Sequence, residues 1–317
     1  MNRNITNSTK MICCLMVFLH HFYLEHPWVS TLGRTACCVF FFLSAYGITK
    51  SLNKKNVGIM DFLKRRLSKV YIPLLMVNAI ALMAFMILKG AGNVPIFSVF
   101  CNQITTVKAD SLSFLYLFDI MQMDSVTWFI DVLLIGYLFV WCLSNIPSRH
   151  KRVLSAVSGY LAMMFLSAVI TPPRIWYLID TLGFMYGILY AEYDSKISSI
   201  NSNSSSKMLI VSVFVFLIFS GAGIALKEMI LGRYMKLIII GYSLSACAIV
   251  AMAGYSKHRE SRICKQLGLL SFFVYLIHVK IANTLFAIDV TNVAIVFFAV
   301  LLCSIVMNML YSHLLSR

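Results

Sequence analysis

Residues 35–52 read TACCVFFFLSAYGITKSL, an apolar run with a single charged side chain, Lys50. A helix rises about 1.5 Å per residue, so a run of this length nearly matches the roughly 30 Å hydrocarbon core of a membrane. The run does not alternate between polar and apolar residues as a strand of a transmembrane barrel does. The segment therefore predicts a membrane-spanning helix.

The whole chain has the same character. Of its 317 residues, 60% are hydrophobic and 12% are charged, and the mean hydropathy is +0.84. A soluble domain carries about 25% charged residues, so a soluble protein is excluded. We expect an all-α integral membrane bundle of about ten transmembrane helices, forming one domain over residues 1–317. The predicted spans are 11–29, 35–52, 70–88, 127–145, 153–171, 175–191, 208–226, 234–254, 267–287 and 291–313.

The lysines and arginines in the loops predict the orientation of these spans, because cytoplasmic loops are enriched in them. With the N-terminus inside, 19 of the 27 basic residues face the cytoplasm, seven face outward and Lys280 lies inside a span. Both termini are therefore predicted to be cytoplasmic. A further crossing at 94–124 would place the basic loops 149–152 and 257–265 outside, so we expect a re-entrant or interfacial segment there.

The formal charge of +15 falls mainly on the predicted inner loops. Anionic lipid headgroups are the expected partners of such loops, and no nucleic acid is expected. The nine cysteines show no Cys-x-x-Cys spacing, and most lie in apolar runs, so neither a zinc site nor a disulfide framework is expected.

Ionisable side chains inside membrane spans are candidates for function, because each costs about 2.5–3.5 kcal/mol at a helix centre. The candidates are His20, His21, Asp131, Asp180, His278 and Lys280. We expect His278 and Lys280 to make structural contacts, with Asp131 or Asp180 as ionic partners.

His21 is placed about ten residues into the first span, near the middle of the membrane. An imidazole is suited to proton transfer because its ordinary pKa is close to neutral. Neighbouring helical residues point about 100° apart, so His20 and His21 cannot both face one small site. Glu25 follows His21 by four residues and either orients the imidazole or marks the outer interface.

A basic segment at 61–73 reads DFLKRRLSKVYIP and leads into the third predicted span. It is either an ordinary positive-inside anchor or a receptor for the phosphates of a cytosolic ligand. Arg65, Arg66 and Lys69 are its candidate phosphate-binding residues.

Several short motifs occur in a fixed order along the chain. They are Lys10 with Val17 and His21-Phe22, FFFLSAYG at 40–47, Arg66 and Lys69 ahead of Pro73, Trp128-Phe129, and Ser271 with Tyr275-Leu276 and His278. Together they resemble the membrane-bound acyltransferase 3 family, which contains bacterial O-acetyltransferases of surface polysaccharides. The resemblance covers essentially the whole chain.

The chain departs from the family's usual pattern at four positions. Lys10 and Lys69 stand where arginine is usual, Ala45 stands for glycine, and Leu133 stands where some members have glutamate. Lysine offers phosphate a point charge rather than a bidentate fork, so bidentate binding at Lys69 is not expected.

The resemblance implies an enzyme of the bacterial inner membrane that takes an acetyl group from acetyl-CoA. The acceptor would be a hydroxyl of a cell-surface polysaccharide or of its lipid-linked precursor. His21, supported by Glu25, would act as the general base or as an acyl relay, with His20 in reserve. The coenzyme A phosphates would lie at Arg65, Arg66, Lys69 and Lys10, and no metal is implied.

Arg34, Ser44 and Trp128 are the candidate substrate-binding residues. Each also has a structural interpretation, as an interfacial cation, a helix-packing hydroxyl and an interface anchor. Ser44 lacks the glycines of a nucleophile elbow, so it is not expected to be a covalent nucleophile. The competing hypotheses for the whole chain are a transporter or flippase of a lipid-linked sugar or small metabolite, and a scaffold of a polysaccharide assembly complex.

Overall fold

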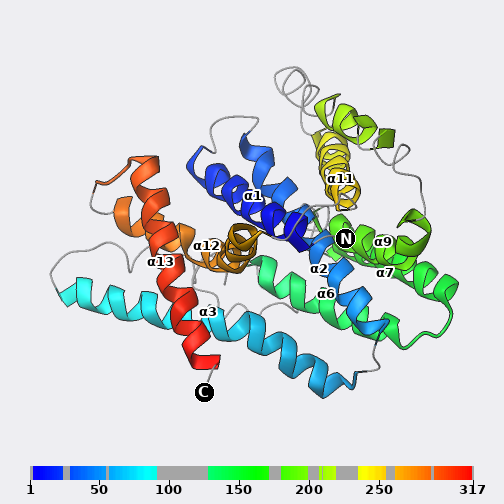
Figure 1. The fold of residues 1–317 in the computed structure, drawn as a ribbon, viewed down its shortest axis with the longest axis horizontal. Coiled ribbons are helices and arrows are strands. Elements are labelled where there is room, and N and C mark those ends of the chain that lie inside the picture. The colour runs from blue at the N-terminus through cyan, green and yellow to red at the C-terminus, as the bar shows by residue number, and fades with distance from the viewer. Residues whose placement is uncertain are drawn as a thin grey trace. The chain divides into compact units, whose positions relative to one another are not determined.

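The computed structural model describes residues 3–23, 29–54, 57–90, 128–170, 180–198, 207–208, 210–218, 235–254, 261–286 and 289–315. All regular secondary structure in these ranges is helical (Figure 1). The labelled helices are α1 (Arg3–Phe22), α2 (Val29–Leu52), α3 (Ile59–Gly90), α6 (Trp128–Ser144), α7 (Arg149–Ile170), α9 (Leu182–Ser198), α11 (Met235–Ala253), α12 (Arg262–Phe286) and α13 (Val293–Leu315).

Each predicted span overlaps helix in the described part of the chain. Three helical stretches there are long and apolar enough to cross a membrane, namely Leu32–Leu52, Arg262–Phe286 and Val293–Leu314. The number of ten crossings therefore stays a prediction. The first span was misplaced, because α1 begins at Arg3 and ends at Phe22 rather than continuing to residue 29. The predicted re-entrant segment at 94–124 lies outside the described residues.

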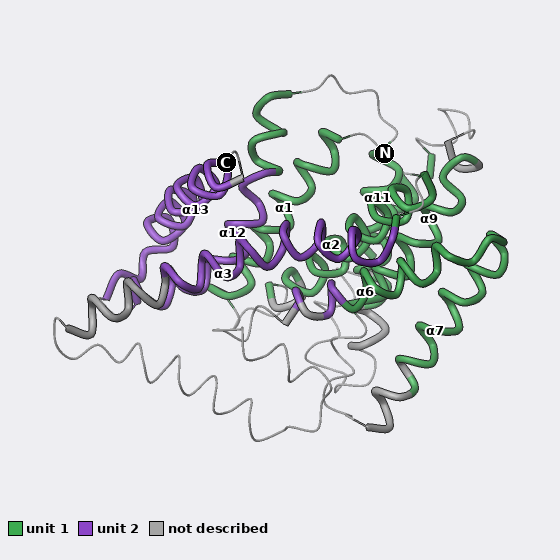
Figure 2. The backbone as a smooth tube through the Cα atoms, turned by 90° about the horizontal axis from the view of Figure 1, so that it is seen from below, with its two compact units in different colours: residues 1–57, 135–268 green, residues 58–134, 269–317 purple. Residues whose placement is uncertain are grey.

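The chain divides into two compact units (Figure 2). Unit 1 consists of residues 1–57 and 135–268, and unit 2 of residues 58–134 and 269–317. Each unit is thus assembled from segments that are far apart in the sequence.

In unit 1, α2 and α9 pack backbone to backbone through two glycines. A Cβ atom at Gly183 would collide with the carbonyl of Cys38, and one at Gly187 would collide with the carbonyl of Phe42. Glycines four residues apart lie on one helix face, and such pairs let membrane helices approach closely. Because both residue numbers increase together, the two helices run in the same direction.

Helix α11 joins this pair and runs in the same direction. The Sγ atoms of Cys38 and Cys247 are 3.8 Å apart, and the hydroxyl of Tyr190 donates a hydrogen bond to the carbonyl of Ala251 (3.0 Å). The cysteines at this contact are fully buried, in agreement with their positions in apolar runs. Cys142, which also lies in an apolar run, is exposed.

Helices α1 and α7 run in the opposite direction to α2. The end of α1 lies beside the start of α2, where His20 contacts Val29, and the start of α7 lies beside the end of α9, where Arg152 contacts Glu192. Predicted spans that follow one another along the chain cross the membrane in opposite directions. The observed directions of these helices agree with that alternation. Which end of the unit faces the cytoplasm stays a prediction.

Unit 2 is built around α12. Tyr275 of α12 packs against Phe129 of α6, with ring centroids 5.5 Å apart, and Phe273 packs against Tyr311 of α13 at 5.8 Å. The Tyr311 hydroxyl also donates to the carbonyl of Ser68 in α3 (3.3 Å). The last helix is thereby tied to the basic segment.

Helix α3 continues through Pro73, so the basic segment, which was predicted to lead into the third span, forms one continuous helix with it. Proline has no backbone N–H, and it therefore removes the hydrogen bond that would end on the carbonyl of Lys69. The basic segment ends at this break in the hydrogen-bond ladder.

Substituting Gly183 with alanine should destabilise the protein, because the new methyl group collides with the Cys38 backbone. We expect a loss of about 1–3 kcal/mol, the usual cost of overpacking. Gly47→Ala is the matched control, since a Cβ there meets no atom within 4 Å. That change should be neutral or stabilising by up to about 1 kcal/mol. Unfolding in detergent by sodium dodecyl sulfate measures both, and equal effects would refute the close contact.

Candidate functional site

The two histidines at the end of α1 have different surroundings. The His20 ring packs on Gly33 of α2, where a Cβ atom would lie 2.6 Å from the ring. His21 is half-buried, and its ring centroid lies 5.1 Å from that of His20 with the planes 73° apart. The two rings thus contact each other edge to face, and the expectation that only one of them faces the site stays a prediction.

His20 is also held by a polar contact with the start of α2. Its Nδ1 lies 3.3 Å from the carbonyl oxygen of Val29. A carbonyl only accepts, so this contact is a hydrogen bond when Nδ1 carries the proton. Packing against Gly33 and the contact with Val29 together give His20 a role in joining α1 to α2.

Lys10 and His21 lie on the same face of α1. They are eleven residues apart, close to three full turns and about 16 Å along the axis. Lys10 is half-buried, and burial lowers the pKa of its ammonium group, while the nearby Cys14 has a smaller opposite effect. One helix face therefore carries a cation toward one end and an imidazole at the other.

The basic cluster lies on α3, in unit 2. Arg65 and Lys69 are exposed, whereas Arg66 is half-buried with its guanidinium 5.6 Å from the centroid of the Phe62 ring. Phe62 is itself buried and holds the arginine by a cation–π contact. Arg66 is thus the positioned member of the cluster. His21 and Lys10 belong to unit 1.

The structure separates the candidate substrate-binding residues. Arg34 and Ser44 are both half-buried on α2, but they are ten residues apart, about 15 Å along the axis. Arg34 lies at the same end of the α1–α2 pair as His21, and it acts electrostatically on Asp180. Glu25 and the side chain of Trp128 lie outside the described residues.

His278 and Lys280 are buried in α12 and bond to their own helix. His278 Nδ1 lies 2.7 Å from the carbonyl of Tyr275, and Lys280 Nζ donates to the carbonyl of Leu276 (3.3 Å). These contacts are with the backbone of α12 itself, so the predicted ionic pairing with Asp131 or Asp180 stays a prediction. The side chain of Asp131, one of their predicted ionic partners, is not described. Within the described ranges no three His, Cys, Asp or Glu side chains are grouped to hold a metal ion.

Comparison with protein families matches residues 7–309 to the acyltransferase 3 family, which is described as an acyltransferase domain. The match spans nearly the whole chain, including α1 with its histidines and α3 with its basic cluster. The chain belongs to the acyltransferase 3 family. No curated protein and no solved structure matched it. Family membership makes it a membrane-embedded acyltransferase, in agreement with its apolar helices.

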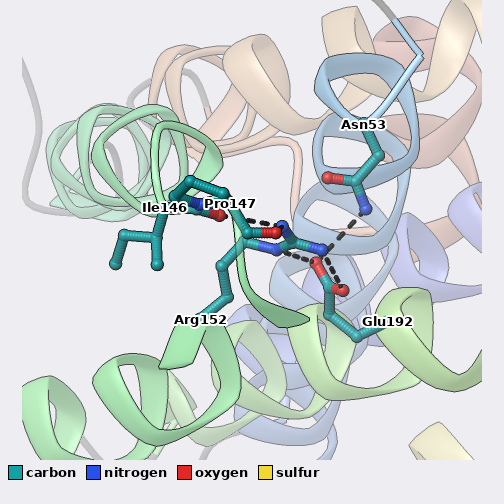
Figure 3. Close-up of polar contacts among 5 residues, drawn as sticks. All are labelled: Asn53, Ile146, Pro147, Arg152 and Glu192. Atoms are coloured by element: carbon teal, nitrogen blue, oxygen red, sulfur yellow. Dashed lines mark hydrogen bonds and ion pairs between the residues drawn. The ribbon is translucent and has the colours of Figure 1, made fainter. Parts of the chain in front are cut away.

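The acyltransferase also contains a buried ionic cluster that the sequence analysis missed (Figure 3). Arg152 Nε and Nη2 donate to the two oxygens of Glu192, at 2.9 and 2.8 Å, and Asn53 donates to the same carboxylate at 3.2 Å. Arg152 Nη1 donates to the carbonyls of Ile146 and Pro147. The hydrogen bonds with Glu192 raise the pKa of Arg152.

This cluster joins α2, α7 and α9 at one end of unit 1. A second pair, Lys50 and Asp194 at 2.8 Å, lies close by and is more exposed. Glu192 and Asp194 were detectable in the sequence, because they are two of only 12 acidic residues and follow a predicted span directly. They were missed because acidic residues were taken as candidates mainly inside the spans.

Replacing Glu192 with glutamine should destabilise the acyltransferase by about 3–5 kcal/mol, because it leaves the Arg152 charge without its buried counter-ion. Asp194→Asn makes the same chemical change in the more exposed pair and should cost at most about 1 kcal/mol. Detergent unfolding of both variants measures the difference. Similar losses in the two would show that burial does not distinguish the pairs.

Proposed function

We propose that the protein is a membrane O-acyltransferase that moves an acetyl group from acetyl-CoA to a hydroxyl of a cell-surface polysaccharide or its lipid-linked precursor. Family membership supports acyl transfer, and it favours this function over a transporter or flippase. The observation that carries the site is the shared face of α1, with Lys10 toward one end and His21 at the other.

In this proposal the coenzyme A phosphates bind at Lys10 and at Arg65, Arg66 and Lys69. Guanidinium and ammonium groups form strong charge-assisted hydrogen bonds with phosphate. The extended pantetheine arm then carries the thioester along α1, over the roughly 16 Å that separates Lys10 from His21. The site is expected in the bacterial inner membrane, with the phosphates on the cytoplasmic side.

His21 removes the proton from the acceptor hydroxyl as its oxygen attacks the thioester carbonyl. A carbon–oxygen bond forms, the carbon–sulfur bond breaks, and the proton leaves with the coenzyme A thiolate. In the relay variant, the His21 imidazole first takes the acetyl group and then passes it to the hydroxyl. His20 is less suited to either role, because its ring is packed on Gly33 and held at Val29.

His21→Ala should lower turnover by about 10²–10⁴-fold, the usual contribution of a general base, while acetyl-CoA binding is retained. Purified protein in detergent, assayed for acetyl-CoA binding and acetyl transfer or hydrolysis, gives both quantities. His20→Ala is the matched control and should lose stability more than chemistry. If only the His20 variant loses turnover, the base has been assigned to the wrong histidine.

Arg66→Ala should weaken acetyl-CoA binding by about tenfold or more, since a hydrogen bond to a charged group contributes about 1.5–3 kcal/mol. Lys64→Ala removes the same charge from an exposed position of α3 and should change affinity little. The two dissociation constants, compared at one salt concentration, test the assignment. Wild-type protein without affinity for any acyl-CoA would overturn the proposed function.

Acetyl-CoA affinity should fall as pH rises toward the ordinary range of lysine, because Lys10 loses its charge as it deprotonates. Burial lowers the pKa of Lys10, so the loss begins at lower pH than for an ordinary lysine near 10.4. Arginine stays protonated throughout this range, and Lys10→Arg should therefore flatten the profile. Identical pH profiles in the two proteins would remove Lys10 from the phosphate site.

A further inference from the structure

Asp180 is an unusual residue in unit 1. It lies just before α9, its side chain is only 2% exposed, and its Oδ1 has no hydrogen-bond partner in the described part of the chain. A buried acceptor without a partner costs about 1–3 kcal/mol, and more when it is charged. Such a group in a folded protein calls for an explanation, and a ligand that completes its hydrogen bonds is one.

The contact between α2 and α9 identifies the residues of α2 that lie at the same level as Asp180. Gly183 touches the Cys38 carbonyl, and the two helices run in the same direction. Three residues earlier on each helix are Asp180 and Thr35, with Arg34 beside them. Arg34 and Asp180 interact electrostatically, which agrees with this register.

Thr35 is the second buried polar residue at the level of Asp180. It is 1% exposed, and its Oγ1 has no hydrogen-bond partner among the residues that the structure describes. The neighbouring Thr181, in contrast, is hydrogen-bonded to Tyr160 of α7. Asp180 Oδ1 and Thr35 Oγ1 are thus the buried polar atoms at this level that lack a partner among the described residues.

These groups fit a neutral ligand with several hydroxyls. The Asp180 carboxylate only accepts hydrogen bonds, the Arg34 guanidinium only donates them, and the Thr35 hydroxyl does either. A sugar hydroxyl donates and accepts at once, so it satisfies all three. A phosphate is disfavoured by the carboxylate, and a hydrocarbon chain would leave the Asp180 and Thr35 oxygens unsatisfied.

We propose that Asp180 and Thr35, together with Arg34, form a subsite that hydrogen-bonds the hydroxyl groups of a carbohydrate acceptor. The subsite lies at the His21 end of the α1–α2 pair, where His20 packs on Gly33 next to Arg34. That the bound carbohydrate is the acetyl acceptor rests on the proposed function. The place and chemistry of the subsite rest on the buried groups themselves.

The test measures carbohydrate binding without acetyl-CoA. The probe is a set of oligosaccharide fragments from the producing cell's own surface polysaccharide, de-O-acetylated with mild alkali and titrated into detergent-solubilised protein. Asp180→Asn and Thr35→Val should each weaken binding about tenfold, the effect of one hydrogen bond to a charged group. Acetyl-CoA binding, titrated separately, should stay at the wild-type value in both variants.

Asp194→Asn is the control, because it makes the same change at the other end of α9, where the carboxylate pairs with Lys50. It should bind the fragments as the wild type does. Should Asp180→Asn fail to fold, the isosteric Thr35→Val decides the question.

Folded variants that bind the fragments as tightly as the wild type would overturn the subsite, as would a wild-type protein that binds none of them. Binding that depends on Asp180 in a protein without affinity for acyl-CoA would leave the subsite standing and refute only the acyltransferase function.

Discussion

The close approach of α2 and α9 at Gly183 and Gly187 determines much of unit 1. Lipid chains are as apolar as the side chains of membrane helices, so burial of apolar surface contributes little to their association. Backbone contact replaces it here, because two absent side chains let the helices meet at the carbonyls of Cys38 and Phe42. The contact also fixes the register, which brings polar residues of the two helices to the same level at both ends.

The two ends of this helix pair differ in how their polar groups are satisfied. At one end the Glu192 carboxylate receives hydrogen bonds from Arg152 and Asn53 and has little left to accept. At the other end Asp180 and Thr35 are as deeply buried, yet each keeps an atom without a partner in the described residues. A fully satisfied cluster stabilises the packing of helices, whereas an incompletely satisfied one is available to a ligand. The same fold thus provides a structural end and, in our proposal, a binding end.

Much of the helical architecture follows from the sequence, because the length of an apolar run is set by the thickness of the membrane. α6 and α13 begin and end within two residues of their predicted spans. α1 does not, since its predicted span was extended through residues 23–29, which include Glu25, His26 and Pro27, whereas the helix ends at Phe22. In the site, the motif order indicated His21 and Arg66. The distinct surroundings of His20 could not be predicted, because they depend on Gly33, thirteen residues away on another helix.

The division of unit 1 in the sequence has a consequence for its biogenesis. Residues 58–134 separate the α1–α2 pair from the other helices of the unit, and Gly183 is synthesised 145 residues after its contact Cys38. At about 5–20 residues per second, α2 therefore waits roughly ten seconds or more for α9 to leave the ribosome. During that time Thr35 and Asn53 lack their neighbours on α9, so insertion of α2 must rely on its apolar length alone. An interval of this length is one in which an insertase or chaperone that shields polar helix faces would have time to act.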